Sequence, residues 1–136
     1  MPRAATLALI TRYYAAFNAG DPDGMLACLS DDIEHRVNEG TPRIGRAKFA
    51  EFCSHMGVSY REQLQEMVIF ATDDGTRAAA EFVVHGQYLQ TDPGLPEAKG
   101  QTYILPAGGF FEVREGRISR ITTFYNLNDW IAQVSR

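Results

Sequence analysis

The sequence RYYAAFNAGDPDGMLACLSDDI, residues 12–33, decides the fold of this chain. In this stretch and just before it, apolar residues recur every three or four positions: Leu7, Ile10, Tyr14 and Phe17. This spacing predicts an amphipathic helix from Ala4 to Ala19. A glycine then stops this helix, and Asp21 is a favourable N-cap for a second, short helix. Pro22 suits the first turn of that second helix, which we expect to end at Leu29. The pair of aspartates that follows leads into a strand.

The rest of the chain predicts one long helix, a set of strands and a short final helix. A loop of turn-forming residues, Asn38–Gly45, separates a strand at Asp32–Val37 from a helix at Arg46–Met56, which Gly57 ends. Apolar and polar residues alternate beyond this point, which is typical of strands. We expect these strands at Arg61–Thr72, Arg77–Gln90, Gln101–Arg114 and Arg117–Tyr125. With Asn128 capping the last helix, the order predicts an α+β domain, its helices on one face of an antiparallel sheet.

Length and composition limit the class of protein. The chain has 136 residues, of which 45% are hydrophobic, and a net charge of −4. This is enough to bury the core of one domain, so residues 1–136 are expected to form a single domain. No basic patch indicates nucleic acid as a partner, and the apolar runs are too short to span a membrane. Two cysteines are too few for a disulfide framework, so we expect free thiols and a cytoplasmic location.

The opening motif, followed by a loop with Pro42, Arg43 and Gly45, resembles ketosteroid isomerases of the nuclear transport factor 2-like superfamily. Nearly the whole chain is similar to ketosteroid isomerase-related and SnoaL-like proteins, through EFVVHGQYLQTDPGLPEAKGQTYILPAGGFFEV and FYNLNDWIAQV. The resemblance implies a cone-shaped barrel, in which a curved, mostly antiparallel sheet wraps around N-terminal helices. It further implies a small hydrophobic ligand inside the cone, no cofactor, and a homodimer in which a second copy covers the outer face of the sheet.

The catalytic groups of the isomerase are only partly present at the matching positions. Tyr13 stands where the isomerase has its catalytic tyrosine. Val37 replaces the general-base aspartate, and Gly108 replaces the protonated aspartate of the oxyanion hole. Since that mechanism needs both aspartates, steroid isomerisation by the familiar route is not expected.

Strand alternation predicts which side chains line the cone, because successive residues of a strand point to opposite faces. With the strand faces of the isomerase, the inward residues are Ile33, His35 and Val37, then Glu81, Val83 and His85, then Ile121, Thr123 and Tyr125. An error of one residue would turn a whole strand to the other face. Phe82 and Val84 make the other face of the middle strand the more apolar one.

On this assignment, His35, Glu81 and His85 bring two imidazoles and a carboxylate into one apolar pocket. Imidazoles exchange protons near neutral pH, and burial raises the pKa of a carboxyl group, so the set predicts acid–base catalysis. The hydroxyl of Tyr13 would donate a hydrogen bond to a ligand oxygen. The other predicted ligand-binding residues are Phe17, Val37, Asn38, Phe52, Met56, Val83, Phe110, Ile121, Thr123 and Tyr125.

Other interpretations of these residues remain open. The histidines could be satisfied polar residues of a half-buried sheet, and Glu81 could pair with an arginine. His35, His85 and Glu81 could also bind a metal, but no short ligand motif is present and no metal is expected. The pair Arg61–Glu62 is typical of solvated strand charges, and the pocket rim is expected to include Tyr60, Tyr103, Asn126 and Trp130.

Three hypotheses for the function follow from these residues and their pattern. The first is a cofactor-independent isomerase, cyclase or hydrolase that acts on a small hydrophobic molecule with a carbonyl group. The second is a non-catalytic carrier or sensor of a lipophilic ligand. The third is a dimeric interaction module.

Overall fold

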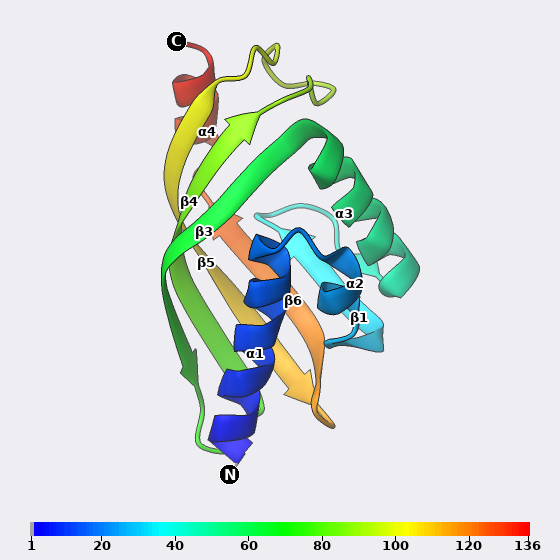
Figure 1. The fold of residues 1–136 in the computed structure, drawn as a ribbon. Helices are drawn as coiled ribbons and strands as arrows, with labels where there is room; N and C mark the ends of the chain where they lie inside the picture. The colour runs from blue at the N-terminus through cyan, green and yellow to red at the C-terminus, as the bar shows by residue number, and fades with distance from the viewer. Residues whose placement is uncertain (1) are drawn as a thin grey trace.

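The computed structural model describes residues 2–136, in which three helices pack on one side of a six-stranded sheet and a fourth lies at its far end (Figure 1). Helix α1, Pro2–Asn18, ends where Gly20 adopts a φ of 67°. Asp21 then caps helix α2, Pro22–Leu26, since its side chain accepts a hydrogen bond from the backbone N–H of Gly24 at 3.0 Å. The predicted opening is therefore confirmed, although α2 stops earlier than expected.

The strands are arranged in the order β2-β1-β6-β5-β4-β3. Their bounds are β1 Leu29–Val37, β2 Arg43–Ile44, β3 Tyr60–Ala71, β4 Arg77–Tyr88, β5 Thr102–Arg114 and β6 Arg117–Tyr125. Strands β1 and β6 are parallel, whereas the other neighbouring pairs are antiparallel. The expected α+β class and curved, mostly antiparallel sheet are confirmed, but the sheet stays open, with β2 and β3 as its edges.

Strand β2 lies within the stretch expected to be a loop, and two of the boundaries that differ from expectation, those of β1 and α3, have a physical reason. Strand β1 begins at Leu29 because this residue already pairs with Ile118 of β6. Helix α3, Arg46–Ser59, continues through Gly57, which was expected to end it. A glycine inside a helix costs only about 1 kcal/mol relative to alanine, and the packing of Phe49, a buried residue of α3 itself, can offset that cost.

The end of α1 is fastened to β3 by one asparagine. The side chain of Asn18 donates to the carbonyl of Leu64 at 3.0 Å and accepts from its N–H at 2.8 Å. Two residues further on, Glu66 has a φ of 54°, and the pairing with β4 shifts register there. This is a β-bulge, which bends the strand and helps the sheet to curve around the helices.

Helix α4, Leu127–Val134, covers the far end of β5 with Trp130 and Val134. The N-cap is Asn126, whose side chain accepts from the N–H of Asp129 at 3.1 Å, and not Asn128 as expected. Within residues 2–136, no helix is long and apolar enough to cross a membrane.

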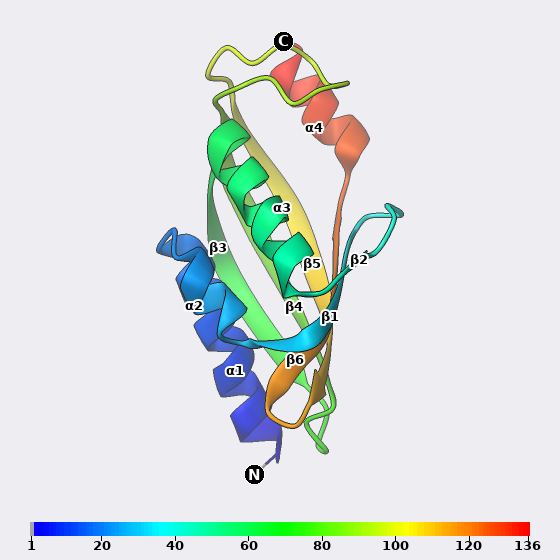
Figure 2. The ribbon, with the colours of Figure 1, turned by 90° about the vertical axis from the view of Figure 1, so that its right-hand side faces the viewer.

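In Figure 2, helix α3 runs in front of the sheet between β3 and β1, both of which it contacts, with α1 and α2 beside it. Their buried faces meet the sheet, where the rings of Tyr14 and Phe82 lie 5.3 Å apart and those of Tyr13 and Phe111 lie 6.1 Å apart. The core therefore forms between the helices and the concave face of the sheet.

The face predicted for β4 is wrong by one residue. Phe82 and Val84 point toward the helices and are buried, whereas Glu81, Val83 and His85 lie on the opposite, outer face. Burial of the more apolar alternate set is favourable, and this outweighs the strand face carried over from the isomerase. On β1 and β6, the side chains lie on the faces that alternation predicts.

Candidate functional site

A cavity of about 1000 Å³ opens between the helices and the concave face of the sheet. It is bordered by α1, α2 and α3 and by residues of β1, β3, β4, β5 and β6. Most of its wall is apolar, with a few polar side chains among aromatic and aliphatic ones, the usual form of a small-molecule site. The apolar part of the wall includes Phe17, Phe49, Phe52, Phe82, Val84 and Leu105.

His35 of β1 is a polar residue in this apolar wall, with only 4% of its surface exposed. Its ring packs against Phe49 and Phe52, with centroids 5.0 and 4.6 Å away. Burial, and secondarily the charge of Arg43, lower the pKa of His35 to about 4. The ring is therefore neutral at neutral pH, with one donor and one acceptor nitrogen. Within residues 2–136, its buried Nδ1 has no hydrogen-bond partner.

Tyr13 and Tyr14 of α1 also line the cavity, and their rings lie 5.2 Å apart. Burial raises the pKa of both phenols, so both are neutral donors. In the described part of the chain, neither hydroxyl is hydrogen-bonded to a protein group. The Tyr14 hydroxyl lies over Gly109 of β5, where an added β-carbon would stand only 2.7 Å from it. Free donors that face an apolar cavity are suited to bind a ligand oxygen.

Glu62 of β3 places a carboxylate in the same cavity. The hydroxyl of Tyr103 on β5 donates to Glu62 Oε2 at 2.5 Å. The two residues pair with Gly86 of β4 from opposite sides, so the three residues form one row across the sheet. A β-carbon at position 86 would stand 2.2 Å from Cζ of Tyr103. Only glycine at this position lets the tyrosine ring lie across β4 and reach the carboxylate.

The surroundings of Glu62 favour its neutral form. Burial raises the pKa of this carboxyl group, while the hydrogen bond from Tyr103 lowers it by a smaller amount. Among residues 2–136, no cationic side chain forms an ion pair with it. A carboxyl group with a raised pKa next to an apolar cavity is a candidate acid–base group, because such values cluster at functional sites.

A second carboxylate closes one end of the cavity. Asp92, in the loop after β4, accepts a hydrogen bond from the Tyr60 hydroxyl at 2.7 Å and lies 3.1 Å from Nε2 of His55 on α3. Its backbone N–H donates to the hydroxyl of Tyr88, which itself donates to the carbonyl of Pro96. The loop is thus held against α3 and β3 at the edge of the cavity.

Many of the residues predicted for the site lie in the cavity wall. Tyr13 and His35 do so, from α1 and β1. The other predicted residues that line the cavity are Phe17, Val37, Phe52, Met56, Thr123 and Tyr125.

The remaining predicted residues lie elsewhere. Glu81, His85 and Val83 project from the outer face of β4, so they do not join His35 in a catalytic or metal-binding set. Three further predicted residues are outside the cavity: Phe110 is exposed on the outer face, Ile121 is buried in the core, and Asn38 accepts a hydrogen bond from the Tyr125 N–H.

Glu62 is the residue that sequence reasoning missed, because the pair Arg61–Glu62 was interpreted as solvated charge. The signal was present in the apolar alternation of β4. If Phe82 and Val84 face inward, Leu64 faces inward opposite Val84, and Glu62 shares the face of Leu64.

The fold defines a domain of the nuclear transport factor 2-like class, with an apolar cavity between its helices and its sheet. The chain belongs to the SnoaL-like domain family, which matches residues 10–121. None of the curated proteins compared with the chain matches it.

Three solved bacterial structures, each described as a proposed polyketide cyclase, are similar over nearly their whole length. The protein from Silicibacter sp. TM1040 is 62% identical, with a TM-score of 0.95, over 97% of this chain and 96% of that one. The protein from Xanthomonas campestris pv. campestris is 55% identical, with a TM-score of 0.96, over 98% and 99%. The protein from Pseudomonas putida KT2440 is 56% identical, with a TM-score of 0.91, over 93% and 95%.

Proposed function

We propose that this protein binds a small, mainly apolar molecule with a carbonyl or hydroxyl oxygen, and that it transfers a proton within that molecule. The observation that carries the proposal is His35, whose neutral ring lies in the cavity wall and whose buried Nδ1 has no hydrogen-bond partner within residues 2–136. A buried polar atom without a partner costs free energy, and a ligand atom that hydrogen-bonds to it would remove that cost.

The polar groups of the cavity suit such a ligand. His35, Tyr13 and Tyr14 offer neutral hydrogen-bonding groups, which hold an oxygen atom without the desolvation of an ion. The similar proteins described as proposed polyketide cyclases support a substrate with carbonyl groups. The reaction would be of isomerase, lyase or cyclase type, with no cofactor, and it would not involve Glu81 or His85.

A matched pair of ligands tests the binding part of this proposal. The single tryptophan, Trp130, lies in the cavity wall, so its fluorescence reports on ligands that enter. We expect β-naphthol to bind more tightly than naphthalene, which has the same rings and no hydroxyl. Replacing His35 with phenylalanine should weaken β-naphthol by about tenfold, the value of one hydrogen bond, and leave naphthalene unchanged. Equal binding of both ligands, or an equal effect of the substitution on both, would contradict the proposed oxygen site.

A non-catalytic carrier is the second candidate. It is favoured by Val37 and Gly108, which stand where the resemblance places the two aspartates of the isomerase. A carrier would bind the ligand through His35 and the tyrosines in the same way. The two candidates differ in whether a bound carbonyl compound exchanges its protons with solvent.

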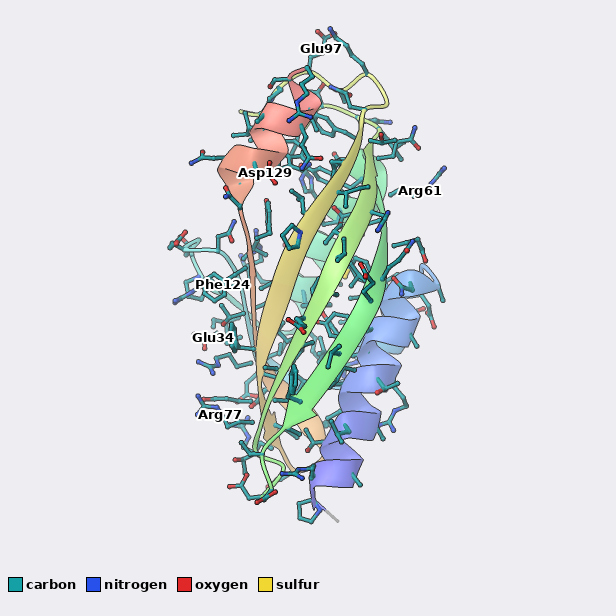
Figure 3. The ribbon with its side chains drawn as sticks, turned by 90° about the vertical axis from the view of Figure 1, so that its left-hand side faces the viewer. Glu34, Arg61, Arg77, Glu97, Phe124 and Asp129 are labelled. Atoms are coloured by element: carbon teal, nitrogen blue, oxygen red, sulfur yellow. The ribbon has the colours of Figure 1, made fainter. Side chains whose placement is uncertain are left out.

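We also propose that the chain forms a homodimer through the outer face of the sheet. No helix covers this face in Figure 3, and Phe124 is labelled at its edge. Large apolar side chains are exposed there: Val68, Phe70, Ile104, Phe110 and Phe124. Apolar patches of this kind mark interaction sites in soluble proteins.

The two free cysteines support the further proposal that the protein acts in the cytoplasm.

A further inference from the structure

We propose that Glu62 is the base that moves the proton, that Tyr103 and Gly86 position it, and that the substrate is an enolisable ketone. This inference rests on the proposed function, since it names the catalytic group and the substrate class of the same cavity.

The contacts of Glu62 leave one of its oxygens available. Oε2 accepts the hydrogen bond from Tyr103, whereas Oε1 receives none from any residue between 2 and 136. The other two carboxylates in the cavity wall already have partners. Asp21 caps α2, and Asp92 is bonded to Tyr60 and paired with His55. Glu62 is therefore the carboxylate best placed to accept a proton from a bound molecule.

The tyrosine gives this carboxylate a defined direction. Tyr103 crosses β4 above Gly86, and its hydroxyl holds Oε2 in place. The phenol is a neutral donor, because burial and the adjacent carboxylate raise its pKa. A neutral partner orients the carboxylate without the large loss of basicity that an arginine or lysine would cause. Burial also raises the pKa of Glu62, which strengthens it as a base.

A carboxylate is a weak base, so it removes protons from carbon only where the resulting anion is stabilised. A C–H group next to a ketone meets this condition when donors bind the ketone oxygen. The neutral hydroxyl of Tyr13 lines the same cavity and can provide such a donor.

The proposed step balances without a co-reactant. Glu62 Oε1 takes the proton from the α-carbon, and the electron pair of the C–H bond forms the C=C bond of an enolate. The π electrons of the carbonyl move onto its oxygen, which is held by a hydrogen-bond donor of the cavity. The protonated Glu62 then returns the proton to carbon, either at the same atom or further along a conjugated system, and the carboxylate and the ketone form again.

The probe reaction is the exchange of the α-protons of β-tetralone with solvent deuterium, followed by NMR. We expect the protein to accelerate this exchange over buffer. The Glu62→Gln substitution should lower the acceleration by a factor of about 100 or more, the usual contribution of a general base. It should change the affinity for β-naphthol less than threefold. Glu51→Gln, at an exposed position of α3, is the matched control and should exchange like the unmodified protein.

Tyr103→Phe separates positioning from simple structural support. In the unmodified protein, the hydrogen bond from Tyr103 lowers the pKa of Glu62. The substitution removes this bond, so the pKa should rise and the acidic limb of the pH–rate profile should shift to higher pH. A slower rate with an unshifted profile would contradict the positioning role, and this test remains valid if Glu62→Gln does not fold.

Exchange by Glu62→Gln at the unmodified rate, or β-naphthol binding without any catalysed exchange, would overturn the catalytic base and leave the binding function standing. Failure to bind either naphthalene compound would overturn the proposed function itself.

Discussion

The ring of Tyr103 lies directly over Gly86, and this contact brings the tyrosine hydroxyl to 2.5 Å from Glu62 Oε2. One glycine near the end of β4 therefore links two residues that are 41 positions apart in the chain. The contact gives the first prediction, because it leaves no room for a side chain at position 86.

Gly86→Ala should displace the Tyr103 ring, since the new β-carbon would stand 2.2 Å from Cζ. We expect a loss of stability of about 1–3 kcal/mol, the usual cost of overpacking, together with loss of the hydrogen bond to Glu62. Urea denaturation measures the first effect. Gly57→Ala is the control, because nothing lies within 4 Å of its β-carbon and alanine is the better helix former. If both variants are as stable as the unmodified protein, the ring does not occupy this position.

Glu62→Gln should make the protein more stable at neutral pH. The folded-state pKa of Glu62 is raised, so the folded protein holds this proton more firmly than the unfolded chain does. The stability that Glu62 contributes by holding this proton is fully present below the pKa of the unfolded chain. It is lost as the pH rises through the raised pKa of the folded protein. Thermal unfolding of both proteins between acidic and neutral pH measures the difference. The gap should widen with rising pH in favour of the glutamine variant, and a constant gap would show that burial does not perturb Glu62.

His35 should give the opposite pH dependence. Its pKa is lowered from 6.5 to about 4, so the unfolded chain binds the proton more readily in this interval. Stability should therefore be fully present above pH 6.5 and fall as the pH drops toward 4, by up to about 3 kcal/mol for this shift. The His35→Phe substitution should remove this part of the slope in urea denaturation. In His85→Asn, which changes a histidine of the outer face, the slope should remain because His35 is intact.

Asn18→Ala should loosen α1 from the sheet. The substitution leaves the N–H and the carbonyl of Leu64 without their side-chain partner, which should cost about 1–3 kcal/mol. Asn128→Ala is the control, since this exposed residue does not cap α4 and should change stability by about 0.5 kcal/mol or less. Equal stabilities of the two variants in chemical denaturation would contradict the role of Asn18.

The proposed dimer should separate when a charge is placed on the outer face of the sheet. Phe110 is 50% exposed, and its ring lies 5.9 Å from that of Phe124. Phe110→Arg should bury a charge without a partner at the interface, and so shift the protein to a monomer in sedimentation velocity. Val58→Arg changes a similarly exposed residue on α3, on the helix side of the sheet, and should leave the assembly unchanged. A monomeric unmodified protein would end the proposal.

Local chemistry carried most of the fold prediction. The start of α2 depends on two adjacent residues, because Asp21 caps the helix and Pro22 fits its first turn. The long strands are recognised from the alternation of apolar and polar residues within each strand. The failures were nonlocal. Gly57 could have ended a helix, and only the packing around α3 carries the helix past it.

The candidate site was half predicted for the same reason. The faces of β1 and β4 were both carried over from the isomerase. On β1 this face is also the apolar one, with Ile33 and Val37, so His35 was placed correctly. On β4 the apolar set is Phe82 and Val84, which faces inward, so Glu81 and His85 lie outside. An error of one residue turns every side chain of a strand, because the period is two.

The sequence by itself determined the helix ends, the strands and the apolar content that make this a curved α+β domain. Those features depend on residues close to one another in the chain. Only the tertiary structure decided that Glu62, Gly86 and Tyr103 meet in one row across three strands. The physical reason is that the register between strands, together with the space left by a missing side chain, arises from the packing of the whole sheet.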